Sequence, residues 1–299
     1  EVLDMNVFFQ YDKVNYFQSY GIDTNYSNSY LGGEFKTELN TLGILFLGKY
    51  GLNGYRANDK LFEIKFDQEK KIYLYSFSAG YFELEPELNF VNYTSNHFDW
   101  KNYNFNKQKT LIANFNLYMK KLQLEFEVNT KIIEDILFYD TLAIASQSED
   151  KVSFSTFSLA KNYSLGNFHF RTVVLYQMTS DKYIVPLPEI VGRQIFYYQK
   201  KIFKKALKIQ LGMGASYTTE YNGYAYMPAT SQFYIQKNKQ LGYYPNIDIF
   251  LNTYLKRAQI FLKYEHINSG RSMGKSYQVP GYPQLNKSLK FGVSWNLFD

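Results

Sequence analysis

The side chains best suited to acid–base chemistry near neutral pH are three histidines, His97, His169 and His266. A hydrolase would need one of them beside a serine or an acid. His97 lies in a segment that we expect to be a loop, and His266 lies near the end of an expected strand. No GxSxG, HExxH or paired-carboxylate motif accompanies them. The pattern favours polar loop and rim histidines over catalytic ones, so we predict no enzymatic activity.

A metal or cofactor site is equally poorly supported by the residue types present. The chain of 299 residues contains no cysteine, so a thiolate metal site, a disulfide framework and a cysteine nucleophile are excluded. The three histidines are far apart in the sequence, and no calcium loop of the EF-hand type is present. We therefore expect the protein to hold no metal and no cofactor.

A second group of polar side chains recurs at every other position of apolar segments. It has two readings: a polar pore lining that selects solutes by ring charges and hydrogen bonds, or side chains that solvate or salt-bridge a plugged interior. The sequence leaves both open. The group consists of Glu125, Glu127, Asn129, Asn114, Asn116, Lys208, Gln210, Asp248, Asn252, Lys263, Glu265 and Lys290.

The elements that must position these residues are strands with one apolar and one polar face. In LEFEVN, Leu124, Phe126 and Val128 alternate with polar residues, and the same period of two recurs from end to end of the chain. Aromatic residues make up 19% of the chain, which also favours strands. We predict that one face meets lipid through Leu124, Phe126, Val128, Leu207, Leu211, Leu251, Phe291 and Val293.

The expected connections between strands alternate between short and long. The short ones are 40–41, 68–70, 120–121, 165–167, 204–205 and 256–257, and the long ones are 17–28, 51–60, 83–101, 137–150, 180–191, 221–238 and 268–286. All seven prolines fall in or beside the long set, as strands that need every backbone N–H require. This rhythm indicates about fourteen strands, with all short turns at one end of an up-and-down sheet.

No stretch approaches the roughly 18 apolar residues of a membrane helix, yet alternating strands cross a membrane as a barrel. We therefore predict an all-β fold: a closed up-and-down antiparallel transmembrane β-barrel of about 14 strands. It would form a single domain over residues 1–299, passing many times through the cell outer membrane. The segment LKFGVSWNLF (289–298) would be the closing strand, with Trp295 and Phe298 at the periplasmic interface. Because EVLD already reads like the middle of a strand, we expect a mature, truncated or partial chain.

Several segments resemble the "putative porin" family of Bacteroidota outer membranes. They are YMPATSQFYIQKNKQLGYYPNIDIFLNTYLKRAQIFLKYEHIN (226–268), VPGYPQLNKSLKFGVSWNLFD (279–299), RQIFYYQKKIFKKALKIQLGMGASY (193–217) and, more loosely, NGYRAND (53–59). Family members are typically longer, so the resemblance implies that this chain corresponds to their C-terminal half. It brings no catalytic or ligand-binding residues that can be transferred.

Two classes of function follow as expectations. The first is passage of small hydrophilic solutes across the outer membrane, and the second is a non-conducting structural role in a larger secretion or uptake assembly. The lining carries both signs of charge, which predicts weak selectivity. The intermediate width of about fourteen strands, narrowed by inward rings such as Tyr118, Phe250 and Tyr254, predicts a small pore. Outer-membrane lipid, lipopolysaccharide and other outer-membrane proteins are the expected partners, and nucleic acid is not. Tyrosine-rich loops such as 220–226 are read as an interface belt, with stacking on sugars or peptides as the alternative.

Overall fold

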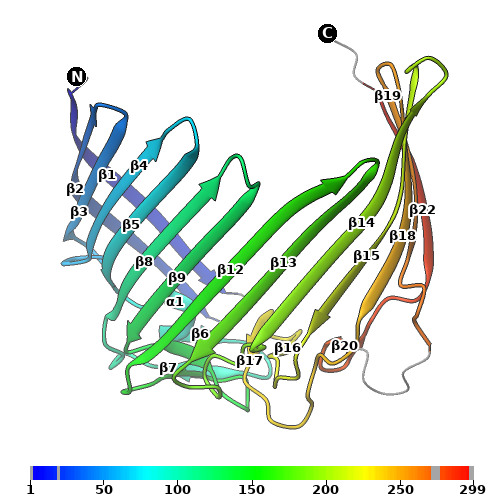
Figure 1. The fold of residues 1–299 in the computed structure, drawn as a ribbon. Helices are drawn as coiled ribbons and strands as arrows, with labels where there is room; N and C mark the ends of the chain where they lie inside the picture. Colours follow the sequence, from blue (N-terminus) through cyan, green and yellow to red (C-terminus); the bar gives the residue numbers. More distant parts are fainter. Residues whose placement is uncertain (1–2, 19–20, 271–276, 296–299) are drawn as a thin grey trace.

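The computed structural model describes residues 3–18, 21–270 and 277–295, and its main element is one antiparallel sheet of fourteen strands (Figure 1). Each strand pairs with the next long strand along the chain. The strands are β1 (Leu3–Gln18), β2 (Ile22–Leu39), β3 (Leu42–Asn53), β4 (Lys60–Glu69), β5 (Tyr73–Leu84), β8 (Gln108–Met119), β9 (Leu124–Glu134), β12 (Val152–Leu165), β13 (Phe168–Thr179), β14 (Ile190–Ile202), β15 (Leu207–Thr218), β18 (Asn246–Leu255), β19 (Ala258–Glu265) and β22 (Ser288–Trp295).

The remaining elements are short and lie in the long connections at the lower end of the sheet in Figure 1. They form four two-stranded ribbons and one helical turn. Their bounds are α1 (Leu88–Val91), β6 (Asn92–Thr94), β7 (Asp99–Lys101), β10 (Leu137–Tyr139), β11 (Ala145–Gln147), β16 (Ala225–Met227), β17 (Gln232–Tyr234), β20 (Tyr277–Val279) and β21 (Tyr282–Pro283). Within the described residues no helix is long and apolar enough to cross a membrane.

The predicted all-β class, the up-and-down order and the number of main strands are confirmed, but the predicted closure is not. Among the described residues β1 and β22 pair with one neighbour each and form the two edges of an open, curved sheet (Figure 1). The alternating pattern specifies which strands are neighbours and which face is apolar. It does not specify the tilt and stagger of strands, and those decide how many strands close a barrel.

The connections follow the predicted rhythm with one correction. Short turns join the strands at the upper end in Figure 1, and Asn40 and Thr41 both have positive φ, 49° and 80°, as a two-residue hairpin turn requires. The expected long connection over 17–28 is wrong. Strands β1 and β2 continue through it and pair as far as Gln18 and Ile22, so cross-strand pairing overrides a stretch whose Asn, Asp and Gly content resembles a loop.

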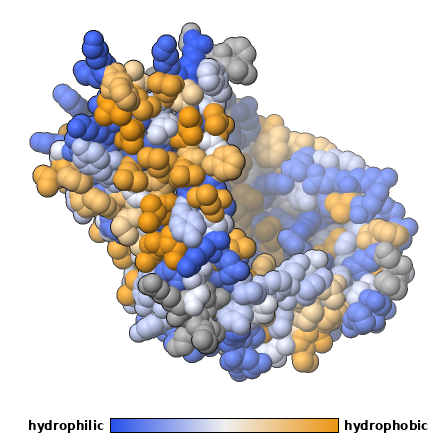
Figure 2. All heavy atoms as spheres, turned by 90° about the vertical axis from the view of Figure 1, so that its right-hand side faces the viewer, coloured by the Kyte–Doolittle hydropathy of each residue, from blue (hydrophilic) through white to orange (hydrophobic). Residues whose placement is uncertain are grey.

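The register of the ladders gives the sheet two distinct faces. One row of paired residues runs Leu211, Leu251, Leu262 and Phe291 across four strands, and the exposed fraction of Phe291 reaches 80%. Since paired residues share a face, tracing such rows across the sheet places all eight predicted lipid-facing side chains on one side. Figure 2 shows this apolar outer surface beside a hollow with a largely hydrophilic lining.

The buried apolar core lies under the long connections and not inside the sheet. One cluster contains Ile133, Ile136, Val152, Ile184, Val185 and Ile235, and a second contains Trp100, Tyr139 and Ala145. The sheet itself leaves one face apolar and exposed and the other polar, so only the loop end can bury side chains from both sides. The predicted position of Phe298 lies outside the described residues.

The two faces make a direct prediction for neighbouring positions in β12. Leu159 points outward and is 46% exposed, whereas Ser158 pairs with Glu127 on the opposite face. A charged side chain at mid-membrane on the lipid side costs about 2–4 kcal/mol. Leu159→Arg should therefore destabilise the protein by about that amount, measured by denaturant unfolding in lipid bilayers.

Ser158→Arg is the matched control for this substitution, because its guanidinium would meet the carboxylate of Glu127 in a hydrated space. The control should fold with little change in the free energy of unfolding. Equal losses for both variants would contradict the assignment of faces.

Candidate functional site

The polar face of the sheet gathers amide, hydroxyl and carboxylate groups around β5, β8, β9 and β12. A cavity of about 350 Å³ lies against Asn114, Asn116, Glu127 and Asn129. Asn114 donates to the Ser78 hydroxyl at 3.1 Å, and Asn129 donates to Glu127 at 3.0 Å. Groups of this kind can exchange hydrogen bonds with neutral, hydroxyl-bearing solutes.

A second polar group covers the same face on β14, β15 and β18. The side-chain amide of Gln210 donates to Gln199 at 2.8 Å, and Asn252 and Tyr254 donate to the side-chain oxygen Oε1 of Gln210. The ammonium group of Lys208 lies 3.8 Å from the centre of the Tyr254 ring. These contacts hold long side chains against the wall.

Four charged residues form a chain of ion pairs across β18, β19 and β22. Lys263 lies 2.9 Å from Asp248 and 2.8 Å from Glu265, and Lys290 lies 2.5 Å from the other oxygen of Glu265. The lysines and carboxylates are equal in number, so the cluster has no net charge. An arrangement that pairs opposite charges along the wall does not produce a ring of one sign, which strong ion selection requires.

The structure therefore places all twelve sequence-predicted polar residues on one face of the sheet. Their role in lining a pore stays a prediction. Those on β8 and β9 form one group, those on β15 and β18 form a second, and the ion-pair chain lies at the β22 edge. The open sheet keeps the first group and the last on strands that are far apart in sheet order.

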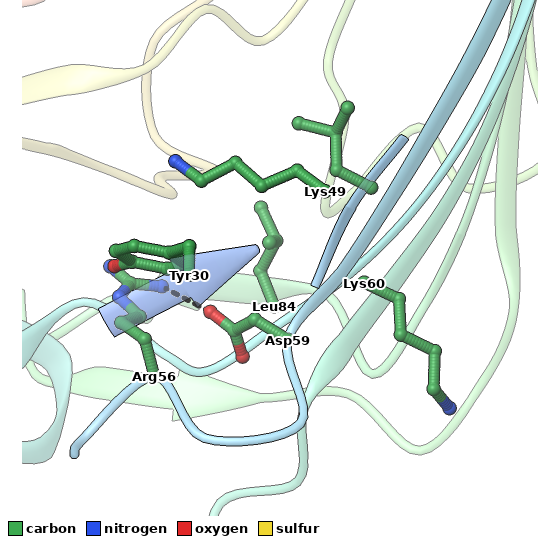
Figure 3. Close-up of a pocket in the computed structure, with 7 residues that line it drawn as sticks. Tyr30, Lys49, Arg56, Asp59, Lys60 and Leu84 are labelled. Atoms are coloured by element: carbon green, nitrogen blue, oxygen red, sulfur yellow. Dashed lines mark hydrogen bonds and ion pairs between the residues drawn. The ribbon is translucent and has the colours of Figure 1, made fainter. Parts of the chain in front are cut away.

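A pocket of about 260 Å³ near the long-loop end was not predicted from the sequence (Figure 3). Tyr30, Lys49 and Arg56 gather on one side of the strands, and Lys60 points to the other side. The Lys49 ammonium group lies 4.0 Å from the centre of the Tyr30 ring and donates to Gln10 at 2.7 Å. The pocket thus combines an aromatic ring with two cations, a combination suited to an anionic or hydroxylated solute.

Asp59 joins this pocket to the neighbouring connection. Its buried carboxylate accepts from Lys107 at 2.8 Å and from the Glu85 backbone N–H at 2.9 Å, and it lies 3.5 Å from Arg56. Lys107 also lies 3.3 Å from the Glu85 carboxylate. These contacts attach the turn between β3 and β4 to the connection that follows β5.

Glycine makes the turn between β3 and β4 possible. Gly54 has φ of +83°, and a Cβ there would lie 1.9 Å from the Ser27 carbonyl oxygen. The NGYRAND segment thus combines a glycine-dependent turn with the buried carboxylate of Asp59. A glycine followed five residues later by an aspartate, Gly54 and Asp59, is the sequence feature from which this turn could have been predicted.

The long connections fold together as a cap at the lower end in Figure 1. The Ile235 N–H donates to the Tyr139 carbonyl at 2.9 Å, and the Tyr93 hydroxyl donates to the Ala229 carbonyl at 3.2 Å. The Tyr224 hydroxyl donates to the Ile184 carbonyl at 2.6 Å. Burial raises the pKa of Tyr224 to about 12, so this donor keeps its proton at neutral pH. The cap therefore packs as one unit.

The histidines occupy three different environments. His97 lies in the connection between β6 and β7, as expected of a loop histidine. The ring nitrogen Nδ1 of His169 lies 2.7 Å from the Ser164 hydroxyl, and its ring stacks on Tyr197. The backbone N–H of His266 donates to Asp248. Within the described part of the chain no hydrogen bond joins a carboxylate to a histidine ring, and no group of three metal-binding side chains is present.

An amphipathic antiparallel sheet with an apolar outer face, short turns at one end and long loops at the other defines the outer-membrane β-barrel class. The chain belongs to the family described as "Putative porin", whose family model matches residues 2–299. The resemblance inferred from the sequence is confirmed. Family and fold together indicate an outer-membrane protein. Among curated proteins no relative matches this sequence.

Similar solved structures are outer-membrane receptors and transporters. The FrpB iron transporter from Neisseria meningitidis (F3-3 variant) is 9% identical with a TM-score of 0.63, over 97% of this chain and 52% of that one. The siderophore receptor PirA from Acinetobacter baumannii is 8% identical with a TM-score of 0.60, over 91% of this chain and 45% of that one. At such identities the likeness shows the fold alone. The chain spans about half the length of these structures.

The ion pairs of Asp59 predict a local effect. Asp59→Asn removes the carboxylate of Arg56 and leaves Lys107 with Glu85 alone, and a buried polar group that loses its partner costs about 1–3 kcal/mol. Limited proteolysis should then cut the connections 54–59 and 85–107 faster, while the sheet keeps its resistance.

Glu149→Gln, at an exposed loop carboxylate, is the control for Asp59→Asn and should leave the cleavage pattern unchanged. Unchanged cleavage in Asp59→Asn would show that the two connections are held together by other contacts.

The lack of native cysteine makes thiol labelling a clean test of the polar face. Ser78 faces Asn114, and its neighbour Ala79 pairs with Ala113 on the apolar side of β5. In lipid bilayers Ser78→Cys should react with a charged, water-soluble thiol reagent, and Ala79→Cys should stay unlabelled. Labelling of Ala79→Cys alone would reverse the faces, and protection of both would indicate a dry interior.

Proposed function

We propose that this chain forms part of the wall of an outer-membrane β-barrel that lets small hydrophilic solutes cross the membrane. The observation that carries the proposal is the consistent separation of faces over all fourteen strands, with every predicted polar residue on the side opposite Leu211 and Phe291. An apolar outer face meets lipid, and a polar inner face borders water.

The proposal includes closure of the sheet by strands beyond these fourteen. An edge strand in hydrocarbon would leave backbone N–H and C=O groups unpaired, at several kcal/mol for each group. The likeness to about half of larger receptor barrels supports a wall segment that is completed by further strands. Members of the family are typically longer than this chain, and in such a longer protein the N-terminal half would provide the closing strands.

The proposed passage is narrow and weakly selective. The wall presents both signs of charge, paired in the chain from Asp248 to Lys290, so neither cations nor anions are strongly favoured. Rings also occupy the polar face: Tyr197 and Phe250 lie 6.5 Å apart over Gly212, where a Cβ would lie 2.6 Å from Phe250. The loop cap narrows one end further.

The cap also favours a second candidate function. Its connections share buried clusters and mutual hydrogen bonds, such as that from Ile235 to Tyr139. A mouth closed by such a folded unit suits a non-conducting structural subunit of a larger assembly. In both readings the protein has no catalytic role.

Planar-bilayer recording of the full-length protein tests the proposal. We expect small channels with weak ion selectivity. Changing Glu125 and Glu127 together to lysine should shift the reversal potential toward anion preference, because both side chains belong to the polar face.

The same change of charge at the exposed loop residues Glu149 and Asp150 should shift the reversal potential much less. Large channels with strong native selectivity would contradict the mixed lining. Silence in every preparation would favour the structural subunit.

A further inference from the structure

The short turns share a charge pattern that neither the pore nor the cap uses. Six short connections join main strands at the upper end in Figure 1: 40–41, 70–72, 120–123, 166–167, 203–206 and 256–257. Four of the six contain a pair of adjacent basic residues, and none of the six, all fully described, contains an acidic residue. The pairs are Lys70-Lys71, Lys120-Lys121, Lys204-Lys205 and Lys256-Arg257.

Most of these cations have no protein partner. Within the described residues no carboxylate lies in ion-pair distance of Lys70, Lys71, Lys121, Lys204, Lys205 or Lys256, and all six are exposed. Lys120 does pair, with Glu69 at 2.5 Å. By contrast, Lys263 and Lys290 of the polar wall are held by carboxylates, and Lys208 lies against the Tyr254 ring. Six exposed lysines at one end of the sheet without a carboxylate beside them favour an anionic surface outside the protein.

Each basic pair stands beside an exposed apolar side chain. The exposed fractions are 62% for Ile72, 51% for Leu122, 74% for Phe203 and 48% for Leu255. A soluble surface gains nothing from an exposed phenylalanine at a turn, whereas the boundary between headgroups and acyl chains accommodates apolar side chains next to lysines.

The aromatic band of the outer face fixes the level of these turns. Phe168 stacks on Phe196 and contacts Tyr198 on the outer side of β13 and β14, and Trp295, 64% exposed, pairs with Ala258 directly after the last basic turn. Such aromatic side chains lie at the membrane interface. Lys200 follows Tyr198 by two residues, which is about 7 Å along a strand. The turn with Lys204 and Lys205 follows on the same side of this band, so the basic turns lie beyond the outer aromatic side chains, where headgroups are expected.

We propose that the short-turn end is a binding rim for anionic phospholipid headgroups of the adjoining leaflet, with lysine pairs on the phosphates and Ile72, Leu122, Phe203 and Leu255 in the acyl boundary. This inference rests on the membrane placement in the proposed function. It does not depend on whether the barrel conducts. The rim would hold the wall at a fixed depth and favour leaflets that are rich in phosphatidylglycerol or cardiolipin.

Spin-labelled lipids measure this preference on the full-length protein reconstituted in phosphatidylcholine. The fraction of motionally restricted label should be higher for phosphatidylglycerol than for phosphatidylcholine, and 1 M salt should reduce the difference. Lys204→Gln with Lys205→Gln should lower the relative affinity for phosphatidylglycerol by roughly fivefold for each charge removed at that turn.

Lys204→Arg with Lys205→Arg keeps the charge and should keep the preference. Lys101→Gln with Lys287→Gln removes two exposed lysines from the long connections and should also leave it unchanged. Thermal unfolding of every variant verifies that the sheet is intact. Equal restriction of both lipids by the native protein, or an unchanged preference in the glutamine variant, would overturn the proposal.

Binding of the native protein to anionic glycan fragments without any lipid preference would also overturn the proposal, because the rim would then fit a periplasmic polymer. Failure of the proposed function itself would give a different result. If the sheet does not stand in the membrane, the protein would restrict neither lipid. Conductance plays no part in the readout, so a silent pore leaves the lipid test intact.

Discussion

Backbone hydrogen bonding in hydrocarbon is the constraint on which the rest of this structure depends. No water is available there, so every N–H and C=O between the two interfaces needs a partner within the protein. The fourteen-stranded ladder provides those partners everywhere except along β1 and β22. Once the ladder is made, side chains alternate between lipid and interior, and the two-faced pattern of the sequence follows from it.

The same constraint explains where the molecule buries its apolar core. A wall with lipid on one side and water on the other needs no apolar filling between sheet layers. The packed clusters around Ile235 and Trp100 lie in the connections and the strand ends beside them, which in the proposed wall would stand outside the membrane and could bury an apolar core. Aromatic rings accordingly gather in the outer band near Phe168 and in the cap near Trp100, in addition to those on the polar face such as Tyr197 and Phe250.

Much of the wall could be predicted from the sequence because alternation is a local signal. Leu211 beside Gln210, or Phe126 beside Glu127, fixes a face without knowledge of any other strand, and the short turns are recognisable from residues such as Asn40 and Lys204. Features that depend on distant partners could not be predicted. Asp59 meets Lys107 only in the fold, the pairing of β1 with β2 extends past an apparent loop, and the openness of the sheet depends on the tilt and stagger of all strands together.

The proposed wall segment of fourteen strands does not close on itself, because β1 and β22 do not pair with each other within the described residues. Spin labels at Met5 on β1 and Phe291 on β22, both exposed on the outer face, report the gap by pulsed electron paramagnetic resonance of the full-length protein in bilayers. Neighbouring strands lie about 4.8 Å apart, so several intervening strands should give a distance beyond roughly 20 Å. A single short distance, as expected of directly paired neighbours, would show that β1 and β22 close the barrel alone and would contradict the account.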